Sequence, residues 1–135
     1  MHQNVLGCTC DPSSIDTEEQ LHAVVETAIK GASAVFTGEV VGISDLGTKI
    51  KLDQIWKGEF TEKLAVIAGV EYISDHIAGG DSCKFKFRIG EKYLVFATKE
   101  EGKLKVHKCS RTNLIGNSER VLKMLEKLAG SAKQN

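Results

Sequence analysis

The residues with the clearest chemical potential are four cysteines, at positions 8, 10, 83 and 109. Thiols in such a set either form disulfides or bind a metal. Structural zinc sites usually use two close pairs such as C-x2-C, whereas only one end of this set is paired, with a single residue between its members. The even count therefore favours two disulfides, and with them an oxidising compartment.

Cys8 and Cys10 are too close along the chain to be joined without strain, because a disulfide needs Cα atoms roughly 5.5 Å apart and a set dihedral. Each is therefore expected to reach a distant partner. The pairing is either Cys8–Cys83 with Cys10–Cys109, or the crossed alternative. Both close long loops, which the chain-entropy model values at about 4 to 5 kcal/mol each.

Other polar clusters are weaker candidates for chemistry. Asp75, His76 and Asp81 fall in a connector over residues 69–82 without clear periodicity, which we interpret as a solvated loop. We expect no metal of the protein's own and no cofactor. The chain has no G-x-S-x-G, H-E-x-x-H or phosphate-loop motif, and two disulfides would leave no thiol nucleophile, so we predict that it is not an enzyme.

Length and charge restrict the class of protein. The chain has 135 residues, 41% of them hydrophobic, which predicts one domain, over residues 8–130. Eighteen basic residues balance eighteen acidic ones, so the global field that favours nucleic acid is missing, and we expect a protein partner and a monomer.

We interpret residues 1–7 as a leader remnant or a flexible N-terminus. Val5 and Gly7 suit the −3 and −1 positions of leader cleavage, and the same letters loosely resemble a lipoprotein box ahead of Cys8. We expect a secreted, periplasmic or cell-surface protein whose leader has been removed, with no membrane contact unless Cys8 is lipidated. Lipidation would use the Cys8 thiol and exclude its disulfide.

Flanking helices are predicted at both ends of the domain. Thr17 and Gln20 form a capping-box pattern ahead of an apolar stripe that begins at Leu21, and Lys30-Gly31 suggests a left-handed stop. Asn117 is expected to cap a second helix, which Gly130 ends. Residues 131–135 are expected to be frayed.

Between these helices the period changes to two, which indicates strands. Gly38 and Gly42 interrupt the first of them, as expected where a strand coils or passes close to another, and the second slips by one residue at Ile55-Trp56, consistent with a bulge. A turn at Glu101-Gly102 indicates a hairpin. The predicted strands cover residues 34–43, 48–56, 63–68, 84–89, 92–97 and 103–109.

These elements predict a mainly β fold with flanking helices. Phe85, Phe87 and Ile89 are expected to face the core, with Lys84, Lys86 and Arg88 on the opposite face. Five or six short coiled strands favour a Greek-key barrel of the OB type over a sandwich, although periodicity cannot separate the two.

Several motifs occur together in an order that resembles a known family. They are Cys8-Thr9-Cys10-x-Pro12, Ala32-x-Ala34-Val35-Phe36-x-Gly38-x-Val40, Ile55-Trp56-Lys57-Gly58, Glu91-Lys92-Tyr93-Leu94-Val95, and Gly102-Lys103-Leu104 followed by Cys109. The chain resembles the N-terminal domain of the tissue inhibitors of metalloproteinases (TIMPs), and more closely their bacterial relatives in the netrin-like superfamily. The likeness covers most of the chain and implies an OB-type barrel.

The resemblance also implies a disulfide pairing and a binding edge. By it, Cys8 pairs with Cys83 and Cys10 with Cys109. In family inhibitors the amino-terminal Cys chelates the protease's zinc through its α-amino and carbonyl groups, and the next residue, here Thr9, enters the specificity pocket. The implied partner-binding edge comprises Cys8, Thr9, Cys10, Asp11, Pro12, Gly80, Asp81 and Ser82.

This sequence departs from the family at Cys8, which follows seven residues. Its nitrogen is an amide that cannot bind zinc unless processing cuts after Gly7. The leading hypothesis is a secreted TIMP-like domain that binds a protein partner, in particular a zinc metalloprotease. The alternatives are a netrin-like binding module that inhibits no protease, and an OB-type nucleic-acid or oligosaccharide binder that uses Lys84, Lys86 and Arg88.

Overall fold

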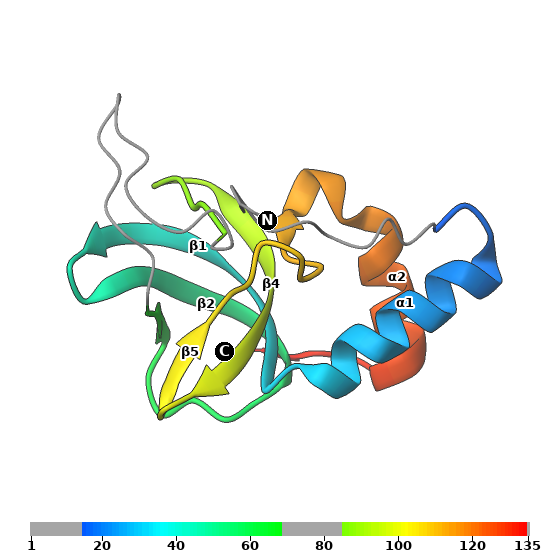
Figure 1. Cartoon of the computed structure of the whole chain (residues 1–135), viewed down its shortest axis with the longest axis horizontal. Coiled ribbons are helices and arrows are strands. Elements are labelled where there is room, and N and C mark those ends of the chain that lie inside the picture. The colour runs from blue at the N-terminus through cyan, green and yellow to red at the C-terminus, as the bar shows by residue number, and fades with distance from the viewer. Residues whose placement is uncertain (1–14, 69–84, 135) are drawn as a thin grey trace, which may run out of the picture.

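The computed structural model describes residues 15–68 and 85–134. In this part of the chain a five-stranded barrel is preceded by one helix and followed by another (Figure 1). The helices are α1 Glu18–Gly31 and α2 Glu119–Ala129, with a 3-10 turn, η1 Ile115–Asn117, before α2. The strands are β1 Ala34–Ser44, β2 Gly47–Lys57, β3 Leu64–Ile67, β4 Lys92–Glu100, β5 Lys103–Lys105, β6 Asn113–Leu114 and β7 Lys133–Gln134.

The sheet closes on itself. The strands follow the order β1-β2-β3-β5-β4, and β4 then pairs with β1, which completes the barrel. The β3–β5 seam is parallel and short, with the single pair Ile67↔Leu104, whereas the other seams are antiparallel. The prediction of a mainly β barrel with a helix at each end is confirmed, and its architecture is consistent with an OB-like barrel.

Bulges in β2 and β1 give the sheet its curvature, because an extra residue in one strand increases the local twist. The register changes between Val35/Phe36, where β2 skips Trp56, so the predicted slip at Ile55-Trp56 is confirmed. At Gly38 the neighbouring strand β2 leaves no room for a side chain. A Cβ there would come within 2.5 Å of Ile50 Cγ2 and of the Lys51 carbonyl oxygen, which explains the glycine.

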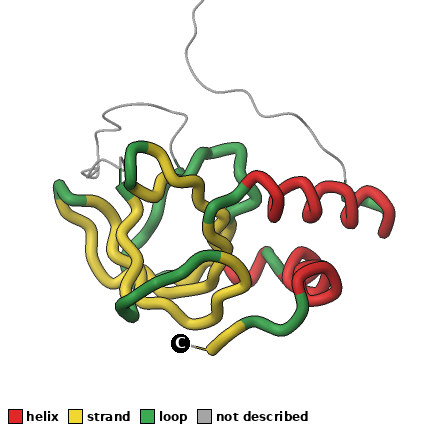
Figure 2. Tube along the Cα trace, turned by 90° about the horizontal axis from the view of Figure 1, so that it is seen from below, coloured by secondary structure: helices red, strands yellow, loops and turns green. Residues whose placement is uncertain are grey.

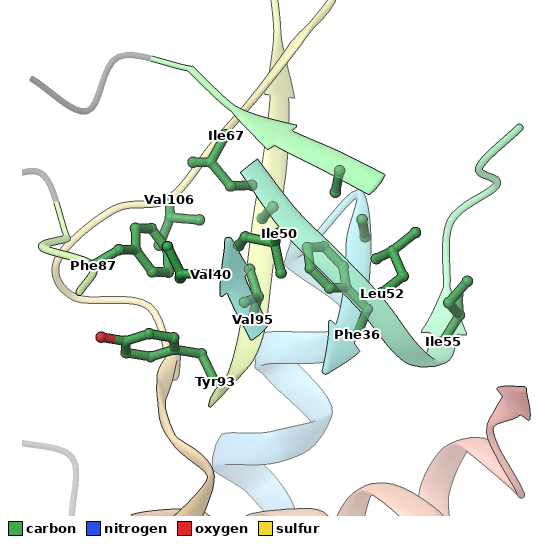
Figure 3. Close-up of a cluster of buried hydrophobic side chains, with 13 residues drawn as sticks. Phe36, Val40, Ile50, Leu52, Ile55, Ile67, Phe87, Tyr93, Val95 and Val106 are labelled. Atoms are coloured by element: carbon green, nitrogen blue, oxygen red, sulfur yellow. The ribbon is translucent and has the colours of Figure 1, made fainter. Parts of the chain in front are cut away.

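β4 is buried on both faces and separates two cores. Tyr93 and Val95 point into the barrel, whose interior is shown in Figure 3, while Leu94 and Phe96 face the helices. The prediction of a central strand at this position is confirmed. The helices lie side by side over this outer face (Figure 1), and their contribution to the second core comes from Leu21, Val25, Val121, Met124 and Leu125.

The capping box of α1 is confirmed. The Gln20 N–H donates to Thr17 Oγ1 at 3.1 Å, and the Thr17 N–H donates to Gln20 Oε1 at 3.0 Å. The expected left-handed stop at Gly31 is wrong. The helix includes Gly31 and passes directly into extended backbone at Ala32 (φ −88°, ψ 148°), because the chain enters β1 at Ala34.

Two expectations at the other end of the chain need correction. Asn117 does not cap α2, because it is the last residue of η1 and Ser118 takes the N-cap position. Gly130 does end the helix, with φ 82°. Instead of being frayed after that glycine, the chain returns to the barrel as β7, which pairs with β2 (Figure 2).

The expected strand over 84–89 is wrong for its described residues. Residues 85–88 form no strand, and Ile89, expected in the core, is 61% exposed. The segment bends back at Gly90, whose N–H donates to the Val40 carbonyl at 2.8 Å. Phe85 and Phe87 alternate because both pack on Tyr93, without strand pairing of their own backbone. The strand expected over 103–109 is also shorter, ending at Lys105.

Candidate functional site

The residues of the predicted binding edge lie outside the described part of the chain. They are Cys8, Thr9, Cys10, Asp11, Pro12, Gly80, Asp81 and Ser82, together with Cys83. The edge and the pairings Cys8–Cys83 and Cys10–Cys109 therefore stay predictions. The described structure shows the residues that adjoin segment 69–84 in the chain and the turn around Cys109.

The two residues that flank segment 69–84 are hydrogen-bonded to the same short stretch of backbone. The Ala68 N–H donates to the Leu104 carbonyl at 2.8 Å, and the Phe85 N–H donates to the Val106 carbonyl at 3.4 Å. We call Ala68 and Phe85 the connector base. The described residues on either side of segment 69–84 thus both lie beside residues 104–106, which come shortly before Cys109 in the chain.

Cys109 lies in a tight turn directly after this stretch. Its N–H donates to His107 Nδ1 at 3.0 Å, and the Ser110 N–H donates to the His107 carbonyl at 3.0 Å. Cys109 is half-buried, and among the described residues no cysteine is a free thiol. The turn holds Cys109 in a fixed position relative to the connector base.

An aromatic cluster supports the connector base from inside the barrel. The ring centroid of Phe85 lies 4.8 Å from that of Phe87 and 5.7 Å from that of Tyr93, and the Phe87–Tyr93 distance is 5.0 Å. The two contacts with Tyr93 are edge-to-face, a geometry that stabilises beyond the area it buries. The Arg88 N–H donates to the Tyr93 hydroxyl at 2.9 Å, which fixes the backbone between the cluster and Gly90.

The cations of the alternative nucleic-acid face do not form a strand face. Lys86 and Arg88 are exposed, but they belong to a bent segment with no strand pairing over residues 85–88. Lys84 lies outside the described residues. The regular array expected for that alternative is absent from this part of the chain.

A surface hollow of about 300 Å³ lies between α1 and α2, lined by Glu18, Glu19, His22, Met124 and Lys127. Lys127 Nζ donates to Glu18 Oε2 at 3.1 Å across the hollow, and the charged residues that line the hollow are exposed.

Over residues 15–68 and 85–134 there is no group of three His, Cys, Asp or Glu residues placed to hold a metal ion. Within the same ranges no helix is long and apolar enough to cross a membrane.

The sequence interpretation did not identify the contact at the far end of β2. Trp56 Nε1 donates to Glu126 Oε2 on α2 at 2.8 Å, and β7 pairs beside it at Gln54 and Ile55. Seventy residues separate Trp56 from Glu126, so no local sequence pattern indicates the contact.

A search of protein-family models found no match to the chain, and a search of curated proteins found none either.

Proposed function

We propose that the protein is a TIMP-like protein-binding domain that inhibits a zinc metalloprotease through Cys8, Thr9 and Cys10, flanked by the 69–82 connector. The observation that carries the proposal is the shared anchoring of Ala68 and Phe85 on residues 104–106, next to the turn that holds Cys109. If Cys10 is joined to Cys109, the amino-terminal edge is tied to the same end of the barrel as the connector base.

The proposed inhibitory chemistry requires a free α-amino group at Cys8. A neutral amine and a carbonyl on one residue form a five-membered chelate on zinc, at the coordination position where water otherwise attacks. An amide nitrogen at the same position has no lone pair to donate. Removal of residues 1–7 is therefore the step that would activate the inhibitor, and Thr9 would enter the specificity pocket of the protease.

The experiment compares two forms of the chain against a panel of zinc metalloproteases. One form retains residues 1–7, and the other begins at Cys8. We expect inhibition only by the form with the free Cys8 amine, and its loss when that amine is acetylated, since acetylation leaves the side chains unchanged. Absence of inhibition by both forms would contradict the inhibitor proposal and leave the netrin-like binding module.

A further inference from the structure

A hydrogen bond inside the turn at residues 107–110 depends on the protonation state of His107. The Cys109 N–H donates to His107 Nδ1 at 3.0 Å. A backbone N–H can only donate, so Nδ1 must offer a lone pair, and the neutral ring then carries its proton on Nε2. A protonated imidazole has a hydrogen on both nitrogens and offers the Cys109 N–H no acceptor. The bond therefore forms only while His107 is neutral.

The residues after Cys109 are held by hydrogen bonds that do not titrate. The Ser110 N–H donates to the His107 carbonyl at 3.0 Å, and the Thr112 N–H donates to Ser110 Oγ at 3.3 Å. Thr112 Oγ1 in turn accepts from the Phe96 N–H on β4 at 2.8 Å. Loss of the imidazole acceptor would thus release the Cys109 amide while the chain beyond it stays attached to the barrel.

The described charged side chains around His107 come from its own turn, from β5 and from the segment 85–88, which is attached by the bond from the Phe85 N–H to the Val106 carbonyl. They are Lys86, Lys105, Lys108 and Arg111, together with Glu100 and Glu101, which pair with Lys105. Lysine, arginine and glutamate ordinarily keep their charge between about pH 5.5 and 7.5, whereas imidazole changes its charge in this range. Among these residues, His107 is therefore the group that responds to mild acidification.

We propose that His107 is a positioning residue, which holds the Cys109 turn at neutral pH and releases it when the ring is protonated. The proposal rests on the proposed function, in which a disulfide between Cys10 and Cys109 ties the inhibitory edge to the barrel. His107 acts through the turn and not by contact with the zinc of the protease. Acidification then loosens the attachment of the edge, so inhibition is weaker at acidic pH than at neutral pH.

The test uses two substitutions at His107, which is exposed, so that neither change disturbs the core. His107→Asn supplies an amide oxygen that does not titrate and that can accept the N–H two residues further along, as asparagine does in Asx turns. His107→Phe keeps a planar ring but has no acceptor. Folding of both variants is checked by circular dichroism.

The first measurement is the protection factor of the Cys109 amide against hydrogen exchange at about pH 7.5 and about pH 5.5, which brackets the imidazole titration. We expect the protection factor of the unmodified chain to fall by about five-fold on acidification, as for the loss of one hydrogen bond. His107→Asn should keep its protection at both pH values, and His107→Phe should lack it at both. No change in the unmodified chain, or an equal change in His107→Asn, would overturn the proposal.

The second measurement is the inhibition constant for a zinc metalloprotease, with forms of the chain that begin at Cys8, at the same two pH values. Protonation of the Cys8 amine and the pH profile of the protease affect all forms alike. The readout is therefore the inhibition constant of the unmodified form divided by that of His107→Asn, and we expect this ratio to rise several-fold on acidification.

A constant ratio, found together with pH-dependent protection of the Cys109 amide, would overturn the positioning role and leave the proposed function intact. Absence of inhibition by every form at both pH values would contradict the proposed function and the positioning role together. The protection factors would still show in that case whether His107 holds the turn.

Discussion

Trp56 in β2 and Glu126 in α2 are joined by a hydrogen bond of 2.8 Å from indole Nε1 to carboxylate Oε2. The bond links the barrel to the carboxyl-terminal helix directly before the chain turns back as β7. Trp56 is also the protein's one tryptophan, so its fluorescence reports on this junction alone. The contact is expected to stabilise the protein, and it lies beside the part of β2 that pairs with β7.

Removing the acceptor should loosen this junction. Glu126→Met keeps a similar helix propensity but loses the carboxylate, and we expect a loss of about 0.5 to 1 kcal/mol in the free energy of unfolding. Trp56 emission should shift toward the value for a more solvated ring. Glu126→Gln keeps an acceptor oxygen and is the matched control. Equal emission shifts for the two variants would argue against the hydrogen bond as the cause.

The same substitution at two buried threonines should have opposite effects. Thr48 Oγ1 is buried and has no hydrogen-bond partner among residues 15–68 and 85–134, whereas Thr112 Oγ1 accepts from the Phe96 N–H at 2.8 Å. We expect Thr48→Val to stabilise the protein by about 1 kcal/mol, and Thr112→Val to destabilise it by about 1 to 3 kcal/mol, because it leaves the Phe96 N–H unpaired. Urea denaturation of both variants measures the contrast, and changes of the same sign would contradict this account.

Two glycines should also respond in opposite directions to alanine. At Gly38 a Cβ meets Ile50 and the Lys51 carbonyl at 2.5 Å, so we expect Gly38→Ala to cost about 2 kcal/mol or more through strand displacement. At Gly31 a Cβ meets no atom of the described residues within 4 Å, and the residue belongs to α1. Gly31→Ala should stabilise by about 0.4 to 1 kcal/mol, since alanine restricts the unfolded chain. A destabilised Gly31→Ala protein in thermal unfolding would instead favour the left-handed stop expected from the sequence.

The capping box gives a prediction local to α1. Thr17→Ala removes the side-chain acceptor for the Gln20 N–H, and we expect a loss of about 1 kcal/mol in stability. Thr27→Ala, at an exposed position of the same helix, is the control and should be neutral or slightly stabilising because of the higher helix propensity of alanine. Equal losses for the two variants in urea denaturation would show that capping is not the cause.

Tyr93 connects the fold to the proposed binding edge. Tyr93→Phe retains the aromatic contacts but removes the acceptor of the Arg88 N–H, so hydrogen exchange at that amide should accelerate by about ten-fold, which corresponds to about 1.4 kcal/mol of local opening. This exchange rate tests the role of the Tyr93 hydroxyl in the fold and does not depend on the proposed function. A further several-fold loss of inhibition by the form beginning at Cys8 would be expected only if the proposed function holds.

The sequence predicted the regular elements where local chemistry decides the outcome. Thr17 with Gln20 marks a helix start through a contact between residues three apart, and the run from Tyr93 to Ala97 indicates a strand buried on both faces. The alternation at Phe85, Phe87 and Ile89 correctly predicted that the two aromatic residues face the barrel core, but it wrongly indicated a strand and a buried Ile89. Its aromatic residues pack on Tyr93, a contact that depends on where β4 lies, and Ile89 remains exposed.

The sequence by itself determined the class of fold, because strand periodicity and the capping box of α1 depend on residues that are close together in the chain. It also identified Cys8-Thr9-Cys10 as the candidate edge, which stays a prediction. Only the tertiary structure decided that the barrel closes through β1 and β4, that Ala68 and Phe85 are both hydrogen-bonded to the backbone of residues 104–106, and that β7 pairs with the end of β2. These features join residues far apart in the chain, and their pairing depends on closure of the barrel, which no local pattern encodes.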